Sequence, residues 1–152
     1  MVKRDYESIA ATLKNEGTVE ERMRRVADVL WDVLSSTGVS WVGFYLPSGP
    51  DELVLGPSRN KPACSPIGLH GACGQVFTSG MPLVVRDVRD LGESYVACDP
   101  RDQSEVVLPL IDSDGKTYAV LDLDSFDIGA FDEGDVQGLI AVLVAAGLTR
   151  ET

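Results

Sequence analysis

The period of the apolar residues changes along this chain, and the order of these changes limits the folds that it can adopt. Apolar residues recur at helical spacing over 19–34 and again over 136–144. Between these stretches, short segments alternate apolar and polar residues as strands do, and turn residues separate them in pairs. Strands joined by short turns pair antiparallel, whereas a doubly wound parallel sheet needs crossover helices. We therefore expect an α/β fold of the α+β type, with a mainly antiparallel central sheet and N- and C-terminal helices flanking one face.

The longest predicted helix has a capping box at its start. Thr18 supplies the N-cap hydroxyl, and Glu21 follows three residues later. Its apolar stripe consists of Val19, Met23, Val26, Ala27, Leu30, Val33 and Leu34. Other helices are expected over Tyr6–Asn15, over Ala72–Ser79, and from a cap at 131–135 to about Gly147.

Five strands are expected, and four of them are expected to form two hairpins. Their predicted bounds are Val39–Leu46, Glu52–Gly56, Pro82–Val85, Ser104–Ile111 and Lys116–Ser125. The first two form one hairpin, and the last two form another around the turn at 112–115. Pro109 cannot donate to a strand ladder, so its strand is expected at an edge or with a bulge. The stretch 57–71 is rich in Gly and Pro, which predicts a functional or mobile loop.

Length and charge indicate a single domain that does not bind nucleic acid or anionic membranes. The 152 residues are enough for one domain, with an N-terminal helical segment over 1–38 and a sheet core and C-terminal helix over 39–147. The formal net charge of −11 disfavours binding to nucleic acid or to an anionic membrane. We recognise no signal peptide and no run of membrane-spanning length, so a cytoplasmic location is expected.

The three cysteines, Cys64, Cys73 and Cys98, fall in or beside predicted loops. An odd number argues against a disulfide framework, which leaves packing, metal binding or redox chemistry. Cys73 falls in the first turn of a predicted helix, where the helix dipole favours a thiolate. A cation such as Arg101 would favour the thiolate of Cys98. A zinc site or a Cys–His dyad would need His70, but the chain lacks the CxxC spacing and an orienting partner, so no metal site is expected.

Three acidic residues are candidates for a common site. Asp122 and Asp124 stand two apart and share one face of their predicted strand, while Glu105 stands at the entrance of the neighbouring strand. If these carboxyl groups meet in a buried place, at least one has a raised pKa and can donate a proton near neutral pH. An exposed strand edge is the alternative.

Two aromatic residues also share a strand face. Trp41 and Tyr45 flank Gly43 on the same face of their strand, which predicts a shallow notch with aromatic walls. Simple cross-strand packing is the alternative for each ring.

Motifs spread from Trp41 to Leu143 are similar to those of a known family. They are Trp41–Leu46, Leu53–Pro57 leading to Lys61–Cys64, Gly71–Gly74, Ala97–Asp99, Ser104–Leu110, Val120–Ser125 and Gly129–Asp135. In this order they resemble the free methionine-(R)-sulfoxide reductases, which are single GAF domains. The resemblance implies a GAF-like domain over 1–152 that reduces free L-methionine-(R)-S-oxide to L-methionine.

The resemblance also implies a role for each matching residue. Cys98 is implied to attack the sulfoxide sulfur and become a sulfenic acid, which Cys64 resolves as a disulfide, with Cys73 as an alternative resolver. Substrate binding is implied for Trp41, Tyr45, Glu105, Asp122 and Asp124. Thioredoxin is implied as the reductant, no bound cofactor is implied, and a homodimer is suggested.

Some loop details depart from the family pattern. The segment from Cys64 to Cys73 is one residue shorter, the segment from Cys73 to Cys98 is one longer, and residues 91–95 replace a usual Gly-His pair. His70 stands where a Lys or Arg is usual. These departures concern substrate detail and the choice of resolver. The competing hypothesis is a non-catalytic GAF module that senses a small molecule or acts as a redox regulator.

Overall fold

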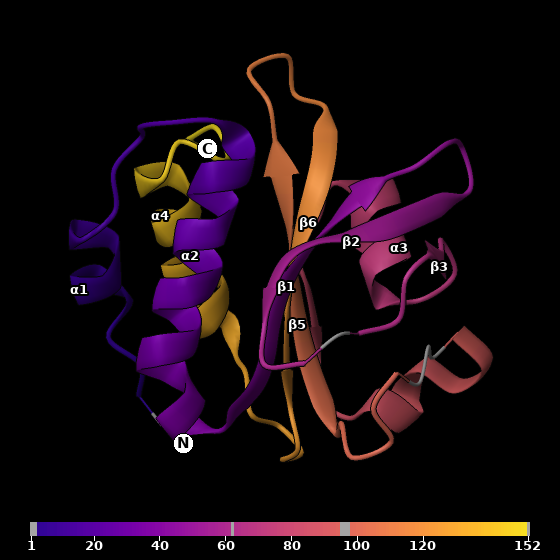
Figure 1. The fold of residues 1–152 in the computed structure, drawn as a ribbon. Helices are drawn as coiled ribbons and strands as arrows, with labels where there is room; N and C mark the ends of the chain where they lie inside the picture. Colours follow the sequence, from indigo (N-terminus) through magenta and orange to yellow (C-terminus); the bar gives the residue numbers. More distant parts are fainter. Residues whose placement is uncertain (1–2, 62, 95–97, 152) are drawn as a thin grey trace.

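The computed structural model describes residues 3–61, 63–94 and 98–151 (Figure 1). Its helices are α1 (Tyr6–Ala11), α2 (Val19–Leu34), α3 (Ala72–Ser79) and α4 (Glu133–Ala145), with 3₁₀ segments η1 (Ser35–Thr37) and η2 (Val88–Ser94). Its strands are β1 (Val39–Pro47), β2 (Glu52–Arg59), β3 (Ile67–Gly68), β4 (Leu83–Val85), β5 (Ser104–Ile111) and β6 (Thr117–Ser125). Every predicted strand and helix is found, with β3 as an addition inside the irregular loop.

One six-stranded antiparallel sheet organises the described chain, in the order β3-β2-β1-β6-β5-β4. The helices α1, α2 and α4 lie on one face, and α3 lies on the other with the segment that leads through η2 (Figure 1). The apolar side chains divide in the same way, so Val42 and Phe44 of β1 join the helix-side core while Trp41 and Tyr45 join the other. This alternation follows from the two-residue period of a strand. The predicted antiparallel α+β fold is confirmed.

The long helix α2 begins with the predicted capping box, because Thr18 accepts from the backbone of Glu21 and the Glu21 carboxylate accepts from the backbone of Thr18. Two members of its predicted stripe are wrong as core residues. Val19 is 39 % exposed and Val33 is 45 % exposed, since Val19 is the first residue of the helix and Val33 is at the edge of its buried side. None of the helices in the described chain is long and apolar enough to cross a membrane.

The strand that carries Pro109 is not at an edge of the sheet, which corrects one of the two expectations for it. β5 lies between β6 and β4, but β4 pairs only with Glu105, Val106 and Val107. Pro109 pairs with Val120 on β6 and lies beyond the short β4, so no strand of the described sheet lies on its other side, where a proline is tolerated as at an edge. The expected bulge is present one residue later, between Leu110 and Ile111.

A buried arginine attaches the start of the chain to the helix side of the sheet. Arg4 is 9 % exposed and donates to Asp135 Oδ1 at 3.0 Å, to Ala130 O at 3.0 Å, and to Thr37 Oγ1 and O at 2.9 Å. Tyr6 donates to the same Asp135 oxygen. The N-terminal segment is therefore part of the folded unit.

Candidate active site

Strand pairing brings the three predicted acids together. Glu105 on β5 lies opposite Asp124 on β6, and Asp122 lies two residues earlier on β6, opposite Val107. Glu105 is 9 % exposed, Asp122 is 5 % exposed, and Asp124 is half-buried. The carboxyl groups therefore share the face of the sheet opposite the long helices, which excludes the exposed-edge alternative.

Burial controls the protonation of this acidic cluster. It raises the pKa of Glu105, and it raises the pKa of Asp122 and of Asp124 well above the usual range, with mutual repulsion of the carboxylates as the second cause for the two aspartates. Asp122 Oδ1 is buried and has no hydrogen-bond partner among the described residues. Burial therefore favours the protonated forms of these acids, and Asp122, which lines the cavity, has one oxygen without a hydrogen-bond partner among the described residues.

The aromatic wall forms on the neighbouring strand. Trp41 and Tyr45 are both buried, with ring centroids 6.1 Å apart and planes tilted by 36°. The indole lies over Gly43, where an added Cβ would meet the Trp41 ring at 2.1 Å. The predicted notch over Gly43 is therefore not open, because the Trp41 ring occupies the space above this glycine. Across β1 and β6, Gly43 faces Asp122, so the aromatic wall adjoins the acids.

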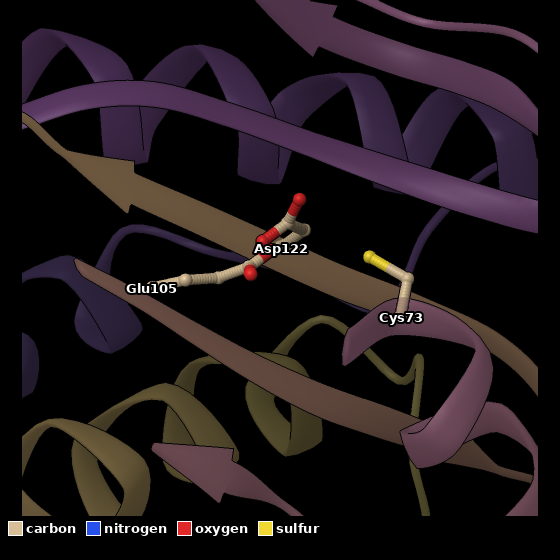
Figure 2. A group of neighbouring side chains, drawn as sticks. All are labelled: Cys73, Glu105 and Asp122. Carbon is tan, nitrogen blue, oxygen red and sulfur yellow. The ribbon is translucent and has the colours of Figure 1, made fainter. Parts of the chain in front are cut away.

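Cys73 points from the first turn of α3 toward Asp122, as Figure 2 shows. Its predicted place in the first helical turn is confirmed, but it is only 5 % exposed, so this cysteine is buried although it lies beside a loop. Burial raises the pKa of Cys73 well above its usual value, and the charge of Asp122 adds to this effect. The predicted thiolate at this helix start is therefore wrong, because burial and nearby acids outweigh the helix dipole.

Cys64 and Cys98 are joined by a disulfide with a Cα–Cα distance of 5.5 Å. Cys64 lies between β2 and β3, and Cys98 lies in the loop before β5. Cys98 is exposed and Cys64 is half-buried. The predicted motif residues Pro62 and 95–97, including most of the approach to Cys98, lie outside the described residues.

The other candidates near the thiols are placed differently. Arg101 donates to both Asp99 oxygens, at 3.1 and 2.9 Å, and its guanidinium stacks over Phe126 at 4.5 Å. Arg101 is therefore paired with the Asp99 carboxylate, and this residue follows Cys98 in the chain. His70 is exposed, so the described geometry does not assemble the Cys₃His zinc alternative. The described side chains whose ligating atoms gather within 4.8 Å are instead Cys73, Glu105 and Asp122.

These side chains surround a cavity of about 50 Å³. Its wall contains the predicted Trp41, Tyr45, Cys73, Cys98, Glu105, Asp122 and Asp124, together with Ala63, Ile67, Gly71, Ala72, Val88, Leu91 and Asp102. An outer hollow of about 360 Å³ shares Trp41, Ala63, Cys98, Asp102 and Asp124 with it. The cavity thus adjoins the surface beside the disulfide.

Asp102 is the polar wall residue that sequence reasoning missed. Burial, followed by the charges of Asp99 and Glu105, raises the pKa of Asp102 to about 7. The available signal was its place in the polar loop four residues after Cys98. The apolar wall residues Val88 and Leu91 had no such signal, because they lie in an irregular segment without a period.

Comparisons with known proteins agree with this geometry. The family model for the GAF domain matches residues 16–149. Free methionine-R-sulfoxide reductase of Saccharomyces cerevisiae is 34% identical over 122 residues, which cover 77% of this chain and 67% of that protein. The protein of the same name from Escherichia coli is 34% identical over 140 residues, which cover 91% of this chain and 79% of that protein.

Solved structures show the same relationship. The X-ray structure of free methionine-R-sulfoxide reductase from Neisseria meningitidis in complex with its substrate superposes with a TM-score of 0.80 at 34% sequence identity, covering 93% of this chain and 84% of that chain. The order of motifs, the sheet and the relatives all point to one group of proteins. This chain belongs to the GAF domain family and, within it, to the free methionine-R-sulfoxide reductases.

Proposed function

We propose that this protein reduces free L-methionine-(R)-S-oxide to L-methionine, with Cys98 as the attacking thiolate. The single observation that carries the proposal is the Cys64–Cys98 disulfide at the edge of a cavity lined by acids and aromatic rings. A thiol pair that can close a disulfide beside a proton-retaining cluster has the parts that sulfoxide reduction requires.

In the first step, the Cys98 sulfur attacks the sulfoxide sulfur and the S–O bond breaks. The oxygen is transferred to Cys98 as a sulfenic acid, so methionine gains two electrons and Cys98 loses two. The departing oxygen must be protonated as this bond breaks. The raised pKa values of Glu105, Asp122 and Asp124 leave protons on the cluster for this purpose.

The same cluster supports recognition of a free amino acid. Because three carboxyl groups share a limited number of protons, the cluster also carries negative charge that can hold the substrate ammonium. Asp122 Oδ1 is an acceptor without a partner among the described residues. Trp41 and Tyr45 offer an apolar wall for the methyl group beside the sulfur.

In the second step, the Cys64 thiolate attacks the Cys98 sulfenic sulfur and water leaves. We propose thioredoxin as the dithiol that reduces the resulting disulfide by exchange, which releases both cysteines and oxidises thioredoxin. Cys73 as an alternative resolver stays a prediction. Its raised pKa makes it a slow nucleophile until the α3 start moves away from Asp122.

Three further features belong to the same proposal. We keep the single domain over 1–152 and the homodimer as predictions. We keep the cytoplasm as the predicted location, because a thioredoxin-linked cycle needs a reducing compartment. The proposed chemistry uses only side chains of this chain and an external dithiol, so it requires no bound cofactor.

An epimer-resolved assay tests the proposal. With thioredoxin, thioredoxin reductase and NADPH, we expect NADPH oxidation with free L-methionine-(R)-S-oxide and none with the S epimer. Cys98→Ser should abolish turnover, whereas Cys73→Ser should retain it. If the fully reduced protein binds the substrate but does not turn it over, the small-molecule sensor replaces the enzyme as the better interpretation.

A further inference from the structure

The aromatic side chains of the cavity are bonded to the backbone that carries Cys64. Tyr45 Oη donates to Cys64 O at 2.9 Å, and Trp41 Nε1 donates to Lys61 O at 2.9 Å. The two rings are 3 % and 8 % exposed, and both line the cavity. The two rings that line the cavity therefore also hold the backbone at Lys61 and Cys64. Cys64 is the disulfide partner of Cys98.

Two further hydrogen bonds fix the ends of this loop. Asn60 Nδ2 donates to Ser40 O at 2.8 Å, which ties the loop start to β1. Leu55 N donates to Ser65 Oγ at 2.9 Å, which ties the residue after Cys64 to β2. With its ends held by polar contacts, the placement of the Cys64 backbone between them depends on the Tyr45 hydroxyl.

The Tyr45 hydroxyl is a hydrogen-bond donor at neutral pH. Burial raises the pKa of Tyr45, and the negative charge of Asp122 raises it further, so the hydroxyl keeps its proton at working pH. The hydrogen bond to the Cys64 carbonyl is partly buried, so a carbonyl that loses this donor must find another donor, which includes water, or remain unsatisfied at a free-energy cost. The Cys64 carbonyl is therefore held in one place as long as the Tyr45 hydroxyl is present.

We propose that Tyr45 is the positioning residue for the resolving thiol, and that Trp41 supports it through Lys61. By fixing the Cys64 carbonyl, Tyr45 keeps Cys64 Sγ within reach of Cys98 while the Cys98 sulfur is a sulfenic acid. The thiolate of Cys64 then attacks that sulfur, the S–S bond forms, the S–O bond breaks, and hydroxide leaves as water after gaining a proton. This inference rests on the proposed roles of Cys64 and Cys98.

A merely structural role for the Tyr45 hydroxyl would lower stability without changing the fate of the sulfenic acid. A positioning role changes that fate, because an unresolved sulfenic acid lives longer and can be trapped. The fraction of trapped Cys98 relative to the Cys64–Cys98 disulfide is therefore the discriminating measurement. One lost hydrogen bond is worth roughly 0.5–1.5 kcal/mol, so a change of roughly two- to tenfold is expected.

Tyr45→Phe and Tyr118→Phe form a matched pair for this test. Tyr118 also donates its hydroxyl to a backbone carbonyl, that of Leu148, but it packs against the helix-side core. Each reduced protein is oxidised with one equivalent of hydrogen peroxide in the presence of dimedone, and the products are measured by mass spectrometry. We expect roughly two- to tenfold more dimedone adduct relative to disulfide in Tyr45→Phe, and the wild-type ratio in Tyr118→Phe. A wild-type ratio in folded Tyr45→Phe overturns the proposal.

Peroxide separates this test from the proposed function, because oxidation then needs no substrate. Failure to turn over methionine sulfoxide would refute the enzyme, while the trapping ratio would still decide the role of Tyr45. If Tyr45→Phe does not fold, Trp41→Phe removes the indole donor to Lys61 and keeps an aromatic ring. Its trapping ratio should rise in the same direction, and an unchanged ratio there would count against the proposal.

Discussion

Glu105 and Asp124 lie directly opposite each other on adjacent strands, so the pairing of β5 with β6 holds two acidic side chains side by side. Asp122 adds a third on the same face. Burial raises the pKa of all three carboxyl groups, and like charge adds to this for Asp122 and Asp124, so the fold tolerates the cluster best when it is protonated.

Stability should fall as the pH rises above the range in which these acids ionise in the unfolded chain. Their pKa values are raised by folding, so above about pH 4 the folded state binds more protons than the unfolded state, and the free energy of unfolding decreases. The limiting slope is about 1.4 kcal/mol per pH unit for each group. Urea denaturation between pH 4.5 and 7.5 measures how the free energy of unfolding changes with pH. Asp122→Asn should make the slope shallower, and Asp51→Asn, at an exposed turn, should leave it unchanged; equal slopes in all three proteins would contradict this.

Asp102 should produce an ionisation near neutral pH in the activity profile. Its pKa is raised to about 7, and it lines the cavity beside Cys98. The pH dependence of kcat/KM should lose this inflection in Asp102→Asn. Asp99→Asn should keep it but move it to lower pH, because the Asp99 charge is one of the causes that raise the pKa of Asp102. An inflection that persists near pH 7 in Asp102→Asn would assign it to another group.

Loss of Arg4 should destabilise the fold strongly. Arg4→Met would leave the buried Asp135 carboxylate with only the Tyr6 hydroxyl and backbone donors, and breaking such a buried pair costs about 3–5 kcal/mol. The matched variant Arg24→Met breaks an exposed pair with Glu20 and should cost less than about 1 kcal/mol. Urea denaturation of both variants measures the difference. Similar small losses would show that Arg4 is not the anchor of the N-terminal segment.

A methyl group at Gly43 should disturb the aromatic wall. In Gly43→Ala the new Cβ would fall 2.1 Å from the Trp41 ring, and overpacking of this kind costs about 1–3 kcal/mol. Trp41→Leu in the same protein should recover part of this loss, because the smaller side chain leaves room. A double-mutant cycle of unfolding free energies measures the coupling. Additive effects would show that the Trp41 ring does not depend on Gly43.

Features set by local periodicity were predictable from the sequence. The two hairpins, the Thr18 capping box and the shared face of Asp122 and Asp124 depend on residues close together in the chain, and all are confirmed. Glu105 lies beside these two acids because the strands β5 and β6 form one of the predicted hairpins. The roles of the site residues stay predictions, because geometry alone does not show a reaction.

Features set by tertiary contacts were not predictable. The pairing of Arg4 with Asp135 joins residues 131 positions apart, and nothing near Arg4 indicates it. The start of α3 alone favours a thiolate at Cys73, whereas packing of α3 on the sheet buries this thiol against Asp122. Pro109 is tolerated in an interior strand because β4 is too short to reach it, and the sequence around Pro109 does not reveal this.

The Cys64–Cys98 bond closes a loop between residues separated by 34 positions. By chain-entropy arguments, closing a loop of this length disfavours the unfolded chain by about 3–4 kcal/mol. If Cys64 and Cys98 react as proposed, each catalytic cycle would alternate the protein between a disulfide-linked form that is more stable and a reduced form that is less stable. The reduced form, which would react with substrate, would be the one more easily unfolded by heat and cut by proteases. A cell that runs short of reductant would therefore accumulate the protein in the more stable disulfide form.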